Sequence, residues 1–331
     1  MTNDTPKNPN PNPTPNPNPT PNPNPTPIPS PTPIPSPHSH PSPHPHSHPN
    51  PNPIPSRHPV LVLGGTGKTG RRVVSRLRQR GQEVRVAARK GPARFDWTDE
   101  NTWEPVLDGV RAAYLVDSMT ADAGDLMREF AKLAAARGVE RLVLLSHRDW
   151  VAAEGEEKLP CERAVRESGA AWTLLKPSWF SQNFSEDAFF RGQVLGGELG
   201  WATGSGTEAF VDADDIADVA VAALTEDGHA GAEYPLTGPR LLSLAQVAEE
   251  ISRATGREVS HRADTPEEFA ARAARAGVPD DFTALLNLLF GWIAENRFAE
   301  LADGVQRALG REPRDFAEYV RSTAVTGVWT P

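Results

Sequence analysis

The sequence predicts an α/β protein in which a doubly wound parallel sheet is covered by helices on both faces. Two observations support this fold class. Short apolar runs alternate with amphipathic stretches from residue 60 onward, which is the pattern of a parallel sheet between helices. The first run, Val60–Leu63, leads directly into the glycine-rich segment Gly64–Gly70 and the start of a helix. A smaller, mostly helical C-terminal lobe and a proline-rich N-terminal tail complete the prediction.

Residues 1–57 form a tail whose composition separates it from the rest of the chain. Of the 34 prolines, 24 lie within residues 1–59, in alternation with Asn, Thr and Ser. Such a segment has too few apolar side chains to bury, so we expect residues 1–57 to be disordered with polyproline character. Six of the nine histidines lie within residues 38–58; they would either gather around a divalent ion or belong to a low-complexity linker. We expect no secretory signal, because no basic segment precedes an apolar one.

The charge and cysteine content restrict the partners of the protein. The chain carries 43 acidic and 34 basic residues, a net charge of −9, which argues against nucleic acid as a partner. No apolar run approaches the length needed to cross a membrane. The single cysteine, Cys161, permits no internal disulfide and fits a reducing environment, so we expect a cytoplasmic protein.

Six apolar runs are the strands that we expect in the sheet. They are Val60–Leu63, Val84–Ala88, Ala93–Trp97, Ala112–Val116, Arg141–Leu145 and Trp172–Leu175. Right-handed crossovers place the loops after these strands along one edge, where a Rossmann-type sheet binds its ligand. We therefore expect residues 58–178 to form a ligand-binding core, and residues 179–331 to supply the remaining sheet and a substrate lobe.

Helix signals become frequent in the C-terminal part of the chain. Ser243 with Gln246, and Thr265 with Glu268, have the spacing of capping boxes, in which side chains satisfy the first free N–H groups of a helix. Three glycines mark expected helix ends: Gly256, Gly277 and Gly310. These signals predict a helical lobe over the open edge of the sheet.

The glycine-rich segment after the first strand is typical of a dinucleotide-phosphate site. Gly64 would allow a tight turn, Gly67 would let the backbone approach a pyrophosphate, and Gly70 would let the helix pack against the strand. Backbone N–H groups and the positive end of the helix dipole would then face the phosphates. The expected contacts are Gly64, Thr66, Gly67, Lys68, Thr69 and Gly70. A nucleoside-triphosphate loop is excluded, because it needs glycine where this chain has Val62.

Two cations near the end of the second strand indicate which dinucleotide would bind. A fold that prefers NAD usually has an acidic residue there, which binds the ribose 2′-hydroxyl. Arg89 and Lys90 would instead meet a 2′-phosphate, so NADP(H) is favoured over the alternative of two solvated loop cations. Asp96 would accept a hydrogen bond from the adenine amine or, alternatively, cap the next turn. Ser118 is also expected to contact the cofactor.

Candidate catalytic residues follow the fifth strand. Ser146 ends that strand and would orient cofactor or substrate, whereas His147 is equally consistent with an ordinary loop residue. Lys158 would bind the nicotinamide ribose or be a solvated lysine among glutamates. The Tyr-x-x-x-Lys pair of short-chain dehydrogenases is incomplete, because Glu154 occupies the position of the tyrosine. We expect neither a hydrolase triad nor a metal at this site.

Aromatic residues gather after the sixth strand. Trp179, Phe180 and Phe184 are expected to line a pocket for a small hydrophobic substrate, with Phe189 and Phe190 nearby. Some of these rings would belong to the core instead, since aromatic residues are large hydrophobes first and ligand contacts second.

Several segments of the chain resemble one known family. They are Gly64–Gly70, Phe95–Thr102, Lys176–Glu186, Val211–Ile216, Val259–His261 and Arg314–Glu318, and the likeness continues to Trp329. In these segments the chain resembles the NmrA-like, atypical branch of the short-chain dehydrogenases/reductases, and within it the ergot-alkaloid agroclavine or festuclavine dehydrogenases. The resemblance covers essentially the whole core and none of the tail. Lys176 departs from it, because an arginine is expected before the proline.

The resemblance implies NADP(H) binding through the glycine segment and Arg89, and hydride transfer to an imine, iminium or quinone-like small molecule. It also accounts for the missing tyrosine. An iminium ion already carries positive charge, so its reduction to an amine develops no oxyanion that needs a proton. The alternative is a non-catalytic NADP(H) sensor, similar to NmrA itself, that acts through a protein partner.

Overall fold

The apolar runs of the sequence form parallel strands in a computed structural model, which describes residues 58–148 and 159–331. The strands of the main sheet are β1 Val60–Leu63, β2 Val84–Ala88, β3 Ala93–Arg94, β4 Ala112–Leu115, β5 Arg141–Leu145, β6 Ala171–Pro177 and β9 Ala232–Leu236. Within the described residues they pair in parallel in the order β3-β2-β1-β4-β5-β6-β9. The order reverses between β1 and β4, and doubly wound sheets bind their ligands outside the carboxyl ends of such a pair.

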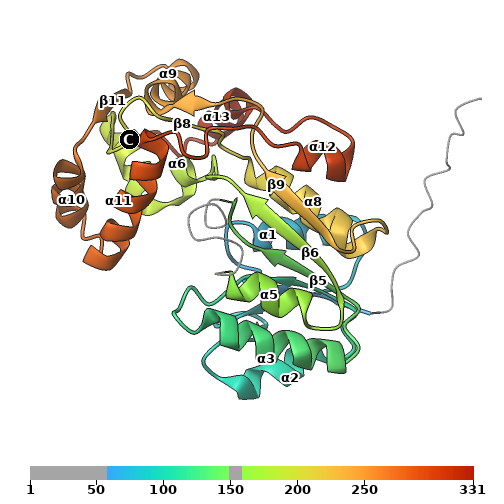
Figure 1. The fold of residues 1–331 in the computed structure, drawn as a ribbon. Helices are drawn as coiled ribbons and strands as arrows, with labels where there is room; N and C mark the ends of the chain where they lie inside the picture. Colours follow the sequence, from blue (N-terminus) through green and yellow to red (C-terminus); the bar gives the residue numbers. More distant parts are fainter. Residues whose placement is uncertain (1–57, 149–158) are drawn as a thin grey trace, which may run out of the picture. The chain divides into compact units, whose positions relative to one another are not determined.

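Helices cover both faces of this sheet (Figure 1). Alternate residues of β1 point to opposite faces, so Val60 and Val62 join one buried cluster while Leu61 and Leu63 join another. The helices over the first cluster are α1 Gly70–Gln79, α8 Ala213–Thr225 and α12 Gly304–Leu309. Those over the second are α2 Trp103–Leu107, α3 Ala123–Ala136 and α5 Pro160–Arg166, with the 3₁₀ turn η1 Glu100–Thr102 before α2.

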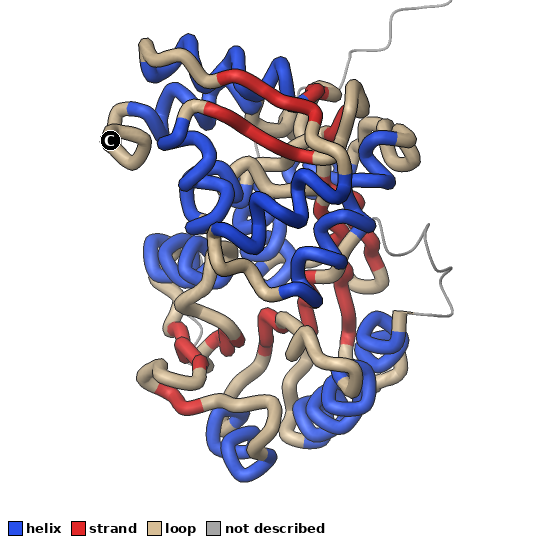
Figure 2. The backbone as a smooth tube through the Cα atoms, turned by 90° about the vertical axis from the view of Figure 1, so that its left-hand side faces the viewer, coloured by secondary structure: helices blue, strands red, loops and turns tan. Residues whose placement is uncertain are grey.

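The C-terminal lobe combines helices with two short pairs of strands (Figure 2). Its helices are α6 Asn183–Glu186, α7 Ala188–Gly196, α9 Leu244–Thr255, α10 Pro266–Arg275, α11 Asp280–Ala294 and α13 Phe316–Ala324. Its strands are β7 Glu198–Trp201 in parallel with β11 Ser260–Ala263, and β8 Thr207–Glu208 antiparallel to β10 Leu242–Ser243. An aromatic core holds these elements together, with the rings of Trp201 and Phe290 stacked at 4.6 Å.

A buried carboxylate joins β11 to α10 within the lobe. The side chain of Asp264 is fully buried and accepts hydrogen bonds from Nε of Arg262 at 2.6 Å and Nε of Arg272 at 2.9 Å. Burial alone would raise the pKa of Asp264, but the hydrogen bonds from Arg272 and Arg262 outweigh it and lower the pKa. This pairing meets the requirement that a buried charge has partners.

The predicted strands β1, β2 and β5 are confirmed to the residue, and the others differ at their ends. β3 ends at Arg94 rather than Trp97, because Asp96 turns the chain by accepting a hydrogen bond from the N–H of Thr98 at 3.0 Å. β4 ends one residue early at Leu115, and β6 is longer than predicted. β9 is absent from the predicted strands. It contains Pro235, which cannot donate to a neighbour, but β9 is an edge strand, where proline is tolerated.

The predicted helix signals of the lobe are confirmed. Both capping boxes form, at the start of α9 and of α10, with the Ser243 and Thr265 side chains accepting from the backbone three residues on. Gly256 and Gly310 end α9 and α12 in the left-handed conformation, and Gly277 follows α10 with a φ of +72°.

Some predictions concern residues outside the described ranges. These are the tail, residues 1–57, with its histidines, and the positions of Glu154 and Lys158. The division of the core at residue 178 stays a prediction. In the ranges that are described, no helix combines the length and the apolar character needed to cross a bilayer.

Candidate functional site

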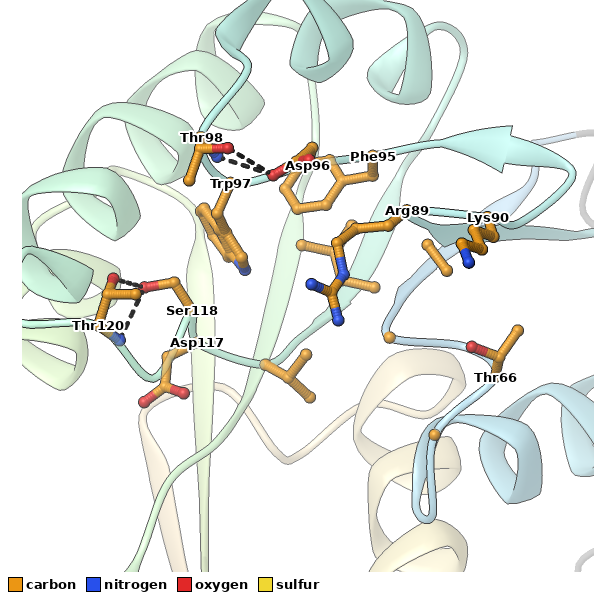
Figure 3. A pocket seen from close by; sticks show the side chains of 15 residues that line it. Thr66, Arg89, Lys90, Phe95, Asp96, Trp97, Thr98, Asp117, Ser118 and Thr120 are labelled. Carbon is orange, nitrogen blue, oxygen red and sulfur yellow. Dashed lines mark hydrogen bonds between the residues drawn. The ribbon is translucent and has the colours of Figure 1, made fainter. Parts of the chain in front are cut away.

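A cavity of about 940 Å³ lies at the carboxyl edge of the main sheet, beside the loops that follow β1, β2 and β4 (Figure 3). Its lining includes these predicted cofactor residues: Gly64, Thr66, Gly67, Arg89, Lys90, Asp96 and Ser118. The remaining lining residues are Leu63, Ala88, Phe95, Trp97, Thr98, Val116, Asp117 and Thr120. The structure therefore brings together side chains that are up to 57 positions apart, at the place where doubly wound sheets bind nucleotides.

The glycine segment can turn and start α1 because two of its residues carry no side chain. Gly64 has a φ of +62°, and a Cβ there would lie 2.9 Å from Cγ2 of Val116. A Cβ on Gly70 would lie 2.2 Å from the carbonyl oxygen of Gly64, so only glycine lets the helix begin against the turn. The segment thus presents bare backbone to the cavity at Gly67, close to the start of a helix, and these features fit a dinucleotide phosphate.

Lys68 and Thr69 of the same segment have other partners. Lys68 Nζ donates to Oδ1 of Asn183 at 2.6 Å and so ties the glycine segment to α6. Burial lowers the pKa of Lys68, although Asp187 and Glu186 act in the opposite direction. The Thr69 hydroxyl accepts a hydrogen bond from Tyr114 Oη at 2.9 Å inside the core. Neither side chain lines the cavity, so any contact of these residues with the cofactor is left to their backbone.

Arg89 and Lys90 follow β2 and line the cavity as exposed side chains. Figure 3 shows the Arg89 guanidinium pointing into the cavity, with Lys90 beside it. Within the described residues, neither side chain forms an ion pair or a hydrogen bond. Two unpaired cations facing a cavity create a positive potential that favours an anionic ligand group.

Asp96 forms a turn, which is one of the two roles that the sequence left open. Its Oδ1 accepts from the N–H and the hydroxyl of Thr98, at 3.0 and 2.9 Å, and so forms the turn after β3. These hydrogen bonds lower the pKa of Asp96, and the charge of Arg89 acts in the same direction. Oδ2 has no hydrogen-bond partner in the described part of the chain and remains free to accept one from a ligand in the cavity.

The loop after β4 closes the opposite side of the cavity. Thr120 Oγ1 donates to Asp122 at 2.5 Å, so the hydroxyl of Ser118 donates to Thr120 across 2.6 Å. Burial raises the pKa of Asp117 in this loop, while the charge of His147 and the N–H of Met119 oppose the rise. Asp117 and His147 therefore interact across the ends of β4 and β5.

Ser146 is buried at the carboxyl end of β5, outside the lining of this cavity. Its Oγ donates to Oε1 of Glu162 at 2.6 Å. Glu162 lies on α5 with its side chain 1% exposed and pairs with Lys176 of β6 at 3.1 Å. The role assigned to Lys158 cannot be placed beside this pair, because that lysine lies outside the described residues.

Of the three aromatic residues predicted to line a substrate pocket, one belongs to the core. Phe184 is fully buried and stacks on Trp201 at 5.4 Å, so its ring has no surface to offer a substrate. This corrects the expectation that Phe184 lines the substrate pocket; the lobe needs its area for packing. Trp179 and Phe180 are partly buried against the lobe core and the sheet, respectively. Phe189 lines a second cavity, of about 900 Å³, against α7 and α10.

Four residues of the candidate site and its surroundings were not singled out from the sequence. Asp117 and Thr120 follow a predicted strand. Ser146 was singled out as a polar residue directly beyond the carboxyl end of a strand, and the same rule would have found Asp117. Trp97 was placed inside a strand, although Asp96 had been named as a possible cap of the next turn, and its hydrogen bond from Thr98 forms that turn. Glu162 reads as one more acid on a surface helix, and only the fold shows that it is buried.

Comparison with known proteins identifies the family. A family model described as NAD(P)H-binding matches residues 64–227. The chain is 34% identical over 284 residues to the uncharacterized oxidoreductase YesF of Bacillus subtilis, covering 83% of this chain and 99% of the relative. It is 33% identical to festuclavine synthase II of Penicillium roqueforti, covering 78% and 96%.

A solved structure shows the same fold. It is the NADPH-dependent quinone oxidoreductase QOR2 of Escherichia coli in complex with NADPH, with a TM-score of 0.69 and 23% identity, covering 80% of this chain and 99% of that one. The family match begins at Gly64, where the glycine segment begins, and the relatives are covered almost end to end. The chain belongs to the NmrA-like, atypical short-chain dehydrogenases/reductases, a family of NAD(P)H-dependent oxidoreductases.

Proposed function

We propose that this protein is an NADP(H)-dependent reductase that delivers hydride to an imine, iminium or quinone-like small molecule without a tyrosine acid. The observation that carries the proposal is that every tyrosine of the chain forms a hydrogen bond inside the protein. The cavity and its two free cations support the choice of cofactor, and the chemistry of an already cationic acceptor supports the reaction.

The cofactor would occupy the cavity at the carboxyl edge of the sheet. The glycine segment would hold its pyrophosphate, and Arg89 with Lys90 would bind the 2′-phosphate of its adenosine half. Asp96 Oδ2 is the acceptor available for the adenine amine. When bound, NADPH supplies a hydride from its nicotinamide ring. The protein contributes binding and orientation.

The chain has three tyrosines, and each has a hydrogen-bond partner in the protein. Tyr114 donates to Thr69, Tyr319 donates to Ser185 at 2.7 Å, and Tyr234 bonds to Nδ1 of His229 at 2.8 Å. Burial raises the pKa of all three phenols. A buried phenol that is already paired is a poor source of a proton for a substrate.

An acceptor that needs no acid fits such a site. Hydride addition to an iminium ion gives a neutral amine, whereas addition to a ketone gives an alkoxide that must be protonated. A quinone-like acceptor can draw its protons from solvent. The names of two similar proteins, a festuclavine synthase and an NADPH-dependent quinone oxidoreductase, agree with these acceptor classes.

An acceptor panel tests the proposal. Purified protein is mixed with NADPH and with matched pairs of one carbon skeleton, a cyclic iminium ion and the corresponding ketone, together with simple quinones. We expect NADPH consumption with the iminium ion or the quinones, and far slower consumption with the ketone. NADPH binding without consumption across the whole panel would contradict the proposal.

The second candidate, a non-catalytic NADP(H) sensor, is favoured by the same lack of a tyrosine acid. It predicts a stoichiometric protein partner whose affinity changes between NADP⁺ and NADPH. A pull-down with each form of the cofactor distinguishes it from the reductase, for which no such difference is expected.

A further inference from the structure

A network of four charges, of which Glu162 and Lys176 are buried, lies behind Ser146. Glu162 Oε2 pairs with Nζ of Lys176 and Nη2 of Arg166, each at 3.1 Å. The same two cations bind Glu233 of β9, at 2.6 Å from Lys176 and 2.5 Å from Arg166. The side chains of Glu162 and Lys176 are 1% and 8% exposed. Two anions and two cations thus balance at the junction of α5, β6 and β9.

These contacts determine which residue is the donor in the hydrogen bond between Ser146 and Glu162. Both cations contact Oε2 of Glu162, so Glu162 is an ionised carboxylate, which can only accept hydrogen bonds. Its other oxygen, Oε1, lies 2.6 Å from Ser146 Oγ, and the hydrogen of that bond must therefore come from the serine. The hydroxyl of Ser146 keeps only its lone pairs for any other partner.

Ser146 is held at the edge where a nicotinamide ring would lie. Its backbone N–H donates to the carbonyl oxygen of Leu175 in β6 at 2.8 Å, and β5 lies between β4 and β6 in the sheet. Ligands of doubly wound sheets bind outside these carboxyl ends. A serine that can only accept would be matched there by the carboxamide N–H or a ribose hydroxyl of the bound nicotinamide nucleoside.

We propose that Glu162 is a positioning residue that holds Ser146 as a hydrogen-bond acceptor for a donor group of the nicotinamide nucleoside. Lys176 and Arg166 bind Oε2 of Glu162 and so leave Oε1 to accept the hydrogen bond from Ser146. The inference rests on the proposed cofactor and goes beyond it, because it assigns Ser146 no part in protonating the substrate.

Replacing Glu162 by glutamine reverses the polarity with little change in shape. Lys176 and Arg166 would hold the amide oxygen, so the amide N–H₂ would face Ser146 and occupy a lone pair of its hydroxyl. Lys176 keeps Glu233 as a partner in this variant. The matched control is Ser168→Ala, because Ser168 is equally buried, at 8% exposure, and its hydroxyl donates to the carbonyl of Val165.

The test measures dissociation constants by fluorescence titration and melting temperatures for Glu162→Gln, Ser146→Ala, their double variant and Ser168→Ala. The ligands are NADPH and adenosine 2′,5′-bisphosphate, which lacks the whole nicotinamide nucleoside. We expect Glu162→Gln and Ser146→Ala each to weaken NADPH binding by about 2- to 10-fold, the range of one net hydrogen bond. The double variant should bind NADPH no worse than Ser146→Ala, because Glu162 acts through Ser146. Binding of adenosine 2′,5′-bisphosphate should be unchanged.

Other outcomes would overturn the inference. Additive losses of NADPH affinity in the double variant, or equal losses of affinity for both ligands, would mean that the network only supports the structure. If Glu162→Gln fails to fold, Ser146→Ala alone decides, and unchanged NADPH binding in that variant would lead to the same conclusion. If the wild-type protein does not bind NADPH, the proposed cofactor itself is wrong. If the wild-type protein binds NADPH and the variants do not behave as expected, only the role of Glu162 is wrong. The NADPH analogue with an acetyl group in place of the carboxamide identifies the donor: the Ser146→Ala effect disappears with it if the donor is the carboxamide N–H, and persists if it is the ribose hydroxyl.

Discussion

Replacing Arg89 and Lys90 by alanine should weaken NADPH binding and leave NADH binding nearly unchanged. Both side chains are exposed and have no partner in the described part of the chain, so their loss breaks no protein contact. A charge-assisted hydrogen bond contributes about 1.5–3 kcal/mol, and the exposed setting favours the lower end. At about 1.4 kcal/mol per tenfold, we expect the double variant to lose about 10- to 100-fold in NADPH affinity.

Fluorescence titrations with NADPH and NADH, each at low and high salt, measure this difference. The NADPH affinity of the wild-type protein should fall more steeply with salt, because screening weakens the phosphate contact. The matched control is Arg94→Ala, which removes a cation from the adjacent strand β3 that pairs with Asp99 and does not line the cavity. Equal losses for the two cofactors, or the same loss in the control, would refute the assignment of Arg89 and Lys90 to the 2′-phosphate.

Three further predictions concern the stability of the fold. Gly70→Ala should destabilise the protein by at least about 3 kcal/mol, because its Cβ would overlap the Gly64 carbonyl. The control Gly81→Ala, at a positive φ with open space around it, should destabilise the protein by only about 1–2 kcal/mol. Similar melting temperatures for the two variants would contradict the packing argument. Asp264 has a lowered pKa, so its ion pairs stabilise the fold above about pH 4 and are lost as pH falls through the folded pKa. Asp264→Asn should therefore be less stable than the wild type at neutral pH, and urea unfolding should show this deficit shrinking in acid; a pH-independent deficit would exclude the linkage. Deleting residues 1–57 should change neither the melting temperature nor NADPH affinity, and a change in either would show that the tail contributes to the core.

The parts of the fold that depend on local rules were predictable from sequence. The turn at Gly64, the strand before it and the capping box at Ser243 each follow from steric or hydrogen-bonding requirements within a few residues. The end of β3 was predicted too late, although the Asp96 turn that ends it is local and had been named as a possibility. The existence of β9 was not predicted from local rules, since it contains Pro235 and lies at an edge of the sheet. Whether a strand lies at an edge is decided by which strands become its neighbours.

The candidate site also contains residues that the sequence predicts and residues that only the fold reveals. Arg89 and Asp96 were found because the rules for dinucleotide folds specify where along the chain such residues lie. Phe184 was misassigned because a sequence does not show whether an aromatic ring faces a ligand or another ring. Glu162 was missed because its place in a charge network depends on Lys176 and Glu233. These residues lie on strands that only the fold brings close to Glu162.

Transfer of deuterium from NADPH deuterated at nicotinamide C4 would reveal hydride delivery by this protein. The protein is incubated with this cofactor and a cyclic iminium ion or a quinone, and the product is examined by mass spectrometry and NMR. For the iminium ion, we predict one deuterium at the carbon next to nitrogen in the amine. For the quinone, whose product can exchange hydrogen with water, we predict loss of the C4 deuterium from the cofactor in step with quinone reduction. Tight binding of the cofactor with full retention of its deuterium in the presence of every acceptor would contradict the account and leave the sensor as the better explanation.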